Sequence, residues 1–159
     1  MKTGIESNRG MASVEFALIL PLFFLLILGI VEFGRYFFIQ HTLQFATREG
    51  VRLALVGGTL ANPQGGGNLT RAQSIVTEIQ QNAITILPAQ LSISIFPIQA
   101  NYTNPQGWQG QQNAGSPGDY MRVVTQYPFQ FLTPMIGSFF PGGTLTMQAE
   151  ATYRNELFN

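Results

Sequence analysis

The sequence predicts an α+β fold. A long N-terminal helix, transmembrane in its first half and amphipathic in its second, should pack on a small antiparallel sheet with a second short helix. Three observations predict this arrangement. An uncharged apolar run lies near the start, apolar residues recur at helical spacing beyond it, and short alternating segments fill the second half of the 159 residues.

Charge is low and balanced. Eight basic and eight acidic residues give a formal net charge of zero, and only 10% of the chain is charged, against about a quarter in typical soluble domains. A nucleic-acid-binding protein would show a basic patch, so we expect no nucleic-acid partner. The absence of cysteine excludes disulfides and thiolate metal sites.

The apolar run lies between Glu15 and Glu32, where residues 16–31 read FALILPLFFLLILGIV. Sixteen helical residues rise about 24 Å, slightly less than a hydrocarbon core of about 30 Å. Flanking apolar residues extend the segment to residues 11–33. We therefore expect a transmembrane helix over 11–33, provided that Glu15 is tolerated near the lipid.

A secretory signal peptide is the first alternative. Its cleavage site would follow the apolar run as small residues spaced A-x-A, but here GIVEFGRYFF follows, so we expect the helix to be retained. Lys2 and Arg9 ahead of the run favour a cytoplasmic N-terminus, whereas Arg35 argues weakly for the opposite orientation.

Helical periodicity continues beyond the lipid-length segment. From residue 34 to residue 56, one face collects apolar or small residues, which are Tyr36, Ile39, Leu43, Ala46, Gly50 and Leu53. A helix over 11–56 would be about 69 Å long, over twice the hydrocarbon core. Its second half, 34–56, should therefore lie outside the membrane as an amphipathic helix. We expect Pro21 to kink or loosen the first half.

Three small residues, Ala46, Gly50 and Ala54, are spaced four apart. Such residues let another backbone approach closely. The approaching element could be a neighbouring helix or the sheet of the same chain. We favour the sheet, because amphipathic helices usually bury their apolar face within their own domain.

Residues 9–54 contain a larger pattern, and together its elements resemble the N-terminal signature of TadE-like proteins, pseudopilins of the tight-adherence (Flp-type) type IV pilus. The elements are Gly10, Val14-Glu15-Phe16-Ala17-Leu18, Pro21, Glu32-Phe33-Gly34-Arg35 and Ala46-x-Arg48-Glu49-Gly50-x-Arg52-x-Ala54. The resemblance covers about a third of the chain. Many relatives carry cysteines in the outer domain, whereas here core packing must suffice.

The resemblance implies a pilin-like fold and proteolytic processing. Residues 1–10 would be a leader peptide that a prepilin peptidase removes by cutting between Gly10 and Met11. The mature chain would sit in the bacterial inner membrane as a single-pass protein with a cytoplasmic N-terminus and a periplasmic C-terminal domain, and it could enter an extracellular pilus. Its partners would be the peptidase, other pilins or pseudopilins, the inner-membrane assembly platform and the lipid bilayer.

Glu15 would become the fifth residue of the mature chain, where pilin-like proteins carry a glutamate. A carboxylate deep in lipid costs about 2.5–3.5 kcal/mol. A neighbour's N-terminal amine about 4 Å away would return roughly 4 kcal/mol at an effective dielectric of about 20, before desolvation. The alternative is a first-turn glutamate that only meets the helix dipole, worth about 0.3–1 kcal/mol. The processing context favours the assembly role.

The C-terminal part, residues 70–159, reads as a small α+β domain behind a Gly-rich linker, 57–69. Thr70 and Gln73 have capping-box spacing, and the helix they open should end at Pro88. Three strands are expected, over 91–95, 119–129 and 144–153, each with one buried face.

The segment 99–118 is a long Gly, Asn and Gln-rich loop around the only tryptophan, Trp108. Such loops are usually binding loops or disordered. A partner contact through Trp108 is one interpretation, and disorder or packing of Trp108 back on the domain is the favoured one. The apolar turn 131–140 could cover the base of the sheet or face the membrane or a partner.

No catalytic, cofactor or metal site is predicted. His41 lacks the second histidine of a zinc helix, and the glycines 65–67 lack the Lys-Ser/Thr of a phosphate loop. We therefore expect no enzyme, no cofactor and no small-molecule substrate. The sequence favours a minor pilin or pseudopilin. The alternative is a membrane-anchored periplasmic interaction protein of the same apparatus that is never cleaved, and an anchored enzyme is the least favoured.

Overall fold

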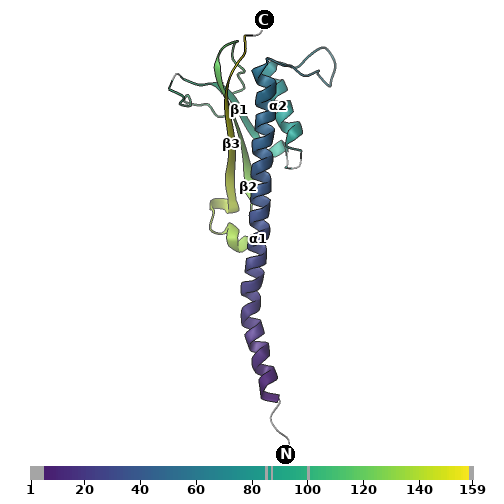
Figure 1. Cartoon of the computed structure of the whole chain (residues 1–159), viewed down its shortest axis with the longest axis vertical. Coiled ribbons are helices and arrows are strands. Elements are labelled where there is room, and N and C mark those ends of the chain that lie inside the picture. The colour runs from purple at the N-terminus through teal and green to yellow at the C-terminus, as the bar shows by residue number, and fades with distance from the viewer. Residues whose placement is uncertain (1–5, 85, 87, 100, 158–159) are drawn as a thin grey trace, which may run out of the picture.

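The structure is a computed structural model that describes residues 6–84, 86, 88–99 and 101–157, without the side chains of residues 6–9 and 88. It confirms the predicted α+β fold (Figure 1). The elements in chain order are α1 (Glu6–Leu55), α2 (Arg71–Asn82), η1 (Pro88–Gln90), β1 (Ser92–Pro97), β2 (Tyr120–Gln130), α3 (Pro134–Gly137), η2 (Pro141–Gly143) and β3 (Thr144–Arg154).

Helix α1 is a rod whose lower half projects away from the domain, while its upper half packs on α2 and the sheet (Figure 1). It starts at Glu6, five residues before the predicted start, and it continues through Pro21. It ends where Gly57 adopts a φ of 69° and the N–H groups of Gly57 and Gly58 donate to the last carbonyls, the glycine stop typical of helices. The predicted leader falls partly outside the described residues, which begin at Glu6.

The sheet is antiparallel, in the order β1-β2-β3. Its register aligns Ile95 with Val123 and Val123 with Ala151. One face packs on α1 and α2 and forms the main core. Buried members of this core include Ile39, Leu43, Ile75, Ile79, Ile93, Ile95, Met121, Val123, Phe129, Met147 and Tyr153.

The prediction that the first strand buries only one face was wrong. Four successive residues of β1, Ile93 to Phe96, are buried. The reason is the long loop 99–118, which covers the outer face of β1 at Ser94 and Phe96 and returns along its free edge. There the Ile95 N–H donates to the Gln111 carbonyl (2.7 Å), and the Asn113 N–H donates to the Ile95 carbonyl (2.8 Å). The loop thereby covers an edge that would otherwise be open to pairing with another chain.

The capping box of α2 is present as expected. The Gln73 N–H donates to the Thr70 hydroxyl, and the Thr70 N–H donates to the Gln73 side chain. The helix ends at Asn82, earlier than Pro88 suggested. The Gly-rich segment 57–69 forms a loop whose two sides are joined by an isolated β-bridge between Ala61 and Asn68.

Candidate membrane and assembly surface

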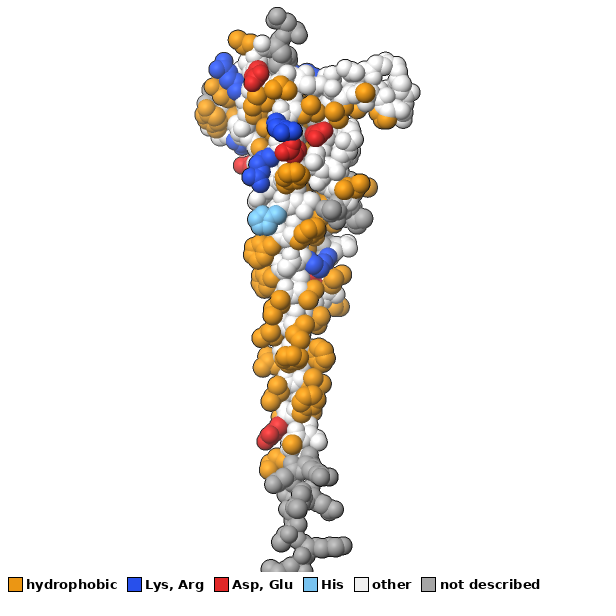
Figure 2. Space-filling model, turned by 45° about the vertical axis from the view of Figure 1, so that its right-hand side comes forward, with side chains coloured by type: hydrophobic (Ala, Val, Ile, Leu, Met, Phe, Trp, Pro, Cys, Tyr) orange, Lys and Arg blue, Asp and Glu red, His pale blue; other side chains and the backbone are white. Residues whose placement is uncertain are grey.

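The lower half of α1 exposes nearly all of its large apolar side chains (Figure 2). Within Gly10–Leu55 its most apolar window is long enough to cross a membrane, and no residue of that window is buried. Charged side chains in Figure 2 gather mainly at the opposite, upper end of the molecule. A contiguous apolar surface of this size on a soluble monomer marks an interaction site. The helix is compatible with a single-pass membrane anchor.

Glu15 interrupts this apolar surface close to its lower end. Its side chain is exposed, and no side chain that the structure describes forms an ion pair with it. Gly10 and Met11, the predicted processing pair, are also exposed and lie within the helical backbone. Pro21 is exposed on the same rod. These four residues therefore lie on the surface of the rod in the described structure.

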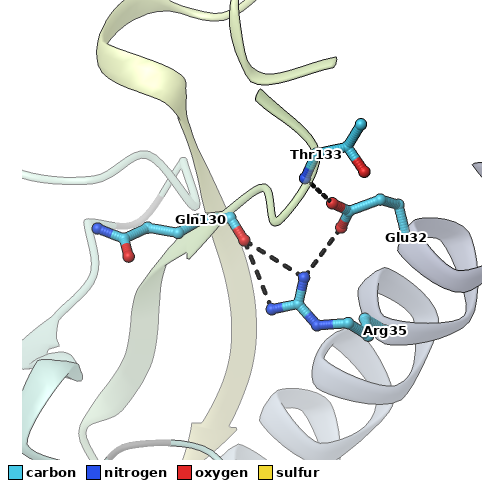
Figure 3. Close-up of polar contacts among 4 residues, drawn as sticks. All are labelled: Glu32, Arg35, Gln130 and Thr133. Carbon is cyan, nitrogen blue, oxygen red and sulfur yellow. Dashed lines mark hydrogen bonds and ion pairs between the residues drawn. The ribbon is translucent and has the colours of Figure 1, made fainter. Parts of the chain in front are cut away.

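A polar latch joins α1 to the lower end of the domain (Figure 3). Glu32 is only 4% exposed, and its carboxylate accepts the Thr133 N–H at 2.7 Å and an Arg35 guanidinium N–H at 2.9 Å. Arg35 also reaches the Gln130 carbonyl at 3.5 Å and lies 5.1 Å from the centre of the Phe129 ring. The latch therefore pairs the buried charge of Glu32 fully, as a buried carboxylate requires.

The sequence marked Glu32 and Arg35 only as part of a family motif. Their three-residue spacing is the usual signal for a helical ion pair, so that pair was open to prediction. The contact with Thr133 was not, because 101 residues separate it from Glu32.

The small residues Ala46, Gly50 and Ala54 are all buried within the domain. In this structure they pack within the chain's own domain, and at Gly50 the packing partner is α2 and not the sheet. A Cβ on Gly50 would collide with Cγ1 of Ile79 and lie 3.3 Å from the Ile75 carbonyl. The glycine is needed because α1 and α2 approach each other closely at this point.

Arg71 and Asn155 form a second polar cluster, at the upper end of α1, that sequence reasoning missed. Arg71 donates to the carbonyls of Ala54 (3.2 Å) and Gly115 (3.0 Å) and to the Asn155 side chain (3.1 Å). A cation at the last carbonyls of a helix also complements the helix dipole. Nearby, burial raises the pKa of the Tyr153 hydroxyl to about 12, although the positive charge of Arg71 acts in the opposite direction.

Trp108 packs back on the domain, as the favoured interpretation held. It is half-buried, and its ring centre lies 5.3 Å from that of Phe96. The Gly110 N–H donates to the Ser94 hydroxyl at 2.9 Å, which fixes this part of the loop over the outer face of the sheet. A partner contact through the exposed part of Trp108 stays a prediction.

Within the described parts of the chain, no group of three or more His, Cys, Asp or Glu side chains lies close enough together to hold a metal ion.

The family model described as TadE-like protein matches residues 10–52. This match confirms the resemblance to TadE-like proteins over the N-terminal helix. The matched segment contains Glu15, Glu32, Arg35 and Gly50, but none of the sheet. No curated protein and no solved structure matches the chain.

Proposed function

We propose that the chain is a minor pilin or pseudopilin of a tight-adherence (Flp-type) type IV pilus. In this proposal a prepilin peptidase cuts between Gly10 and Met11, and the mature subunit acts by packing against other subunits and the assembly platform. The observation that carries the proposal is the exposed apolar rod with one acidic residue near its tip, within the segment that matches the family.

The rod suits both a membrane and a helical filament. Lipid tails and the apolar faces of neighbouring helices offer similar environments, so helices associate in lipid through close packing more than through hydrophobic burial. A subunit can therefore exchange lipid for neighbouring helices at modest cost. The domain remains outside, because α1 is about 75 Å long and the bilayer core takes about 30 Å of it.

In this proposal Glu15 fixes the axial offset between neighbouring subunits. Its carboxylate is exposed and has no ion-pair partner among the described side chains. Processing at Gly10 would create a cationic amine on Met11 of each subunit, and a neighbour's amine could approach the carboxylate along the rod. An ion pair at about 4 Å returns roughly 4 kcal/mol at an effective dielectric of about 20. That gain exists only at one axial offset between subunits.

The decisive experiment compares cells with and without prepilin peptidase. We expect the chain in sheared filaments or at the assembly platform only when the peptidase is present, with Met11 as its first residue. Retention of residues 1–10 on membrane-extracted protein from peptidase-positive cells would instead establish the alternative, an uncleaved anchored interaction protein of the same apparatus.

A further inference from the structure

The turn between β2 and β3, residues 131–143, is apolar and uncharged. Its sequence, FLTPMIGSFFPGG, contains no Asp, Glu, Lys, Arg or His. Three of its side chains point into solvent, Leu132 at 67%, Met135 at 50% and Phe139 at 81% exposure. Exposed apolar residues scattered singly are normal, but three within eight residues form a patch.

This patch lies beside α1 where the helix would leave the bilayer. Twenty helical residues counted from Met11 end at Ile30 and span about 30 Å, the thickness of a hydrocarbon core. The turn is held next to this level, because the Thr133 N–H donates to the Glu32 carboxylate. Figure 1 shows the turn at the lower end of the domain, against α1.

A groove of about 380 Å³ opens between the turn and α1. Its walls include Gly29 and Phe33 of α1 and Ile136 and Phe140 of the turn. The groove is thus continuous with the apolar surface of the rod, since Phe33 is itself exposed. A lipid or protein that covers the rod at this height would therefore also reach the groove.

We propose that the turn 131–143 is a second membrane contact. Leu132, Met135 and Phe139 enter the boundary between head groups and acyl chains in the leaflet next to the domain, and acyl chains fill the groove. Apolar and aromatic side chains with no charge are suited to this depth.

Lipid is favoured over a partner protein for two reasons. The patch is an extension of the rod surface, which lipid covers before assembly, and the turn offers no charged side chain that would orient a protein partner. The contact would hold the domain down on the bilayer, so a subunit must release it on leaving the membrane. The inference rests on the transmembrane placement of α1, but not on pilus assembly.

The test uses single cysteines in the full chain, which has none of its own, in vesicles of phosphatidylethanolamine and phosphatidylglycerol. A nitroxide is attached at Phe139→Cys, and its collision rates with oxygen and with an aqueous nickel chelate are measured. Leu22→Cys, on the rod, is the lipid reference. Leu157→Cys is the aqueous reference, because Leu157 is 86% exposed. It also lies at the end of α1 away from the membrane, since the N–H of the preceding residue, Glu156, donates a hydrogen bond to the Leu55 carbonyl.

We expect nickel collisions at position 139 to be several-fold rarer than at position 157. The same difference should be seen when each vesicle contains a single chain. Equal nickel access at positions 139 and 157, with position 22 protected, would overturn the second contact and leave the anchor intact. Protection that appears only at high protein density would identify a second copy as the occupant and would overturn the lipid contact. Nickel access at position 22 would refute the transmembrane span and, with it, this inference.

Discussion

Arg71 donates a 3.1 Å hydrogen bond to the side chain of Asn155, joining the first turn of α2 to the residue after β3. Asn155 is 2% exposed, and its amide also donates to the carbonyls of Ala114 and Ser116. One side chain thus holds together the end of the sheet, the loop 99–118 and α2. Its loss removes three hydrogen bonds that join these elements.

For that reason, Asn155→Leu should lower the free energy of unfolding by about 2–4 kcal/mol. Denaturant titration of the full chain in detergent, followed by Trp108 fluorescence, measures the change. Gln81→Leu on the exposed face of α2 is the control and should change stability by less than about 0.5 kcal/mol. Equal stability of the two variants would mean that the cluster adds nothing to the fold.

Gly50→Ala should destabilise the domain, because the new Cβ would overlap the Ile79 side chain. Overpacking of this kind costs about 1–3 kcal/mol. Gly34→Ala on the same helix is the matched control, since a Cβ there meets nothing within 4 Å and Ala is the better helix former by about 1 kcal/mol. Combining Gly50→Ala with Ile79→Ala should cost less than the sum of the single changes, as a double-mutant cycle would show.

Glu32→Leu should loosen the latch between α1 and the turn 131–143, because the Thr133 N–H and Arg35 both lose their acceptor. We expect a loss of about 1–3 kcal/mol and faster hydrogen exchange at the Thr133 amide. Glu32→Gln keeps an acceptor oxygen and should show a smaller effect. Glu49→Leu is the control, because it breaks the more exposed pair with Arg52 and should cost at most about 1 kcal/mol. If hydrogen exchange at the Thr133 amide were as fast in Glu49→Leu as in Glu32→Leu, the latch would be contradicted.

Stability should fall as the pH rises from about 10 to about 12, because burial raises the pKa of Tyr153 from 10.0 to about 12. The folded state then binds the phenolic proton more tightly than the unfolded state does, so its advantage is complete below pH 10 and disappears through the folded pKa. Tyr153→Phe should flatten this part of the stability profile, whereas the exposed Tyr120→Phe should leave it unchanged.

Tyr153→Phe should not weaken the domain at neutral pH. The Tyr153 hydroxyl is buried and has no hydrogen-bond partner among the described residues. Removing an unsatisfied buried group is neutral or favourable, by up to about 1 kcal/mol. A clear loss of stability at pH 7 would show that the hydroxyl is satisfied in solution.

Glu15→Leu should insert into the membrane as well as the parent does, because it makes the rod more apolar, but it should abolish assembly. Alkaline extraction of membranes measures insertion, and the amount of pilus recovered after shearing the cells measures assembly. Glu156→Leu, an exposed acid at the far end of the chain, is the control and should assemble. Normal pilus output from Glu15→Leu would refute the proposed role.

The sequence by itself determined the rod, the capping box of α2 and the three strands. Each depends on local order: sixteen uncharged residues in a row, a spacing of three between Thr70 and Gln73, and alternation in β3. These signals act within a few residues, where helix geometry and strand pleating decide which side chains share a face.

Only the tertiary structure decided which elements meet. Gly50 was recognised as a close-approach residue, but its partner at that point is α2 and not the sheet. The Glu32 contact with Thr133, the Arg71 contact with Asn155 and the loop along β1 join residues far apart in the chain. Periodicity shows that a face is buried but not what buries it, because that choice depends on how whole elements pack around one core.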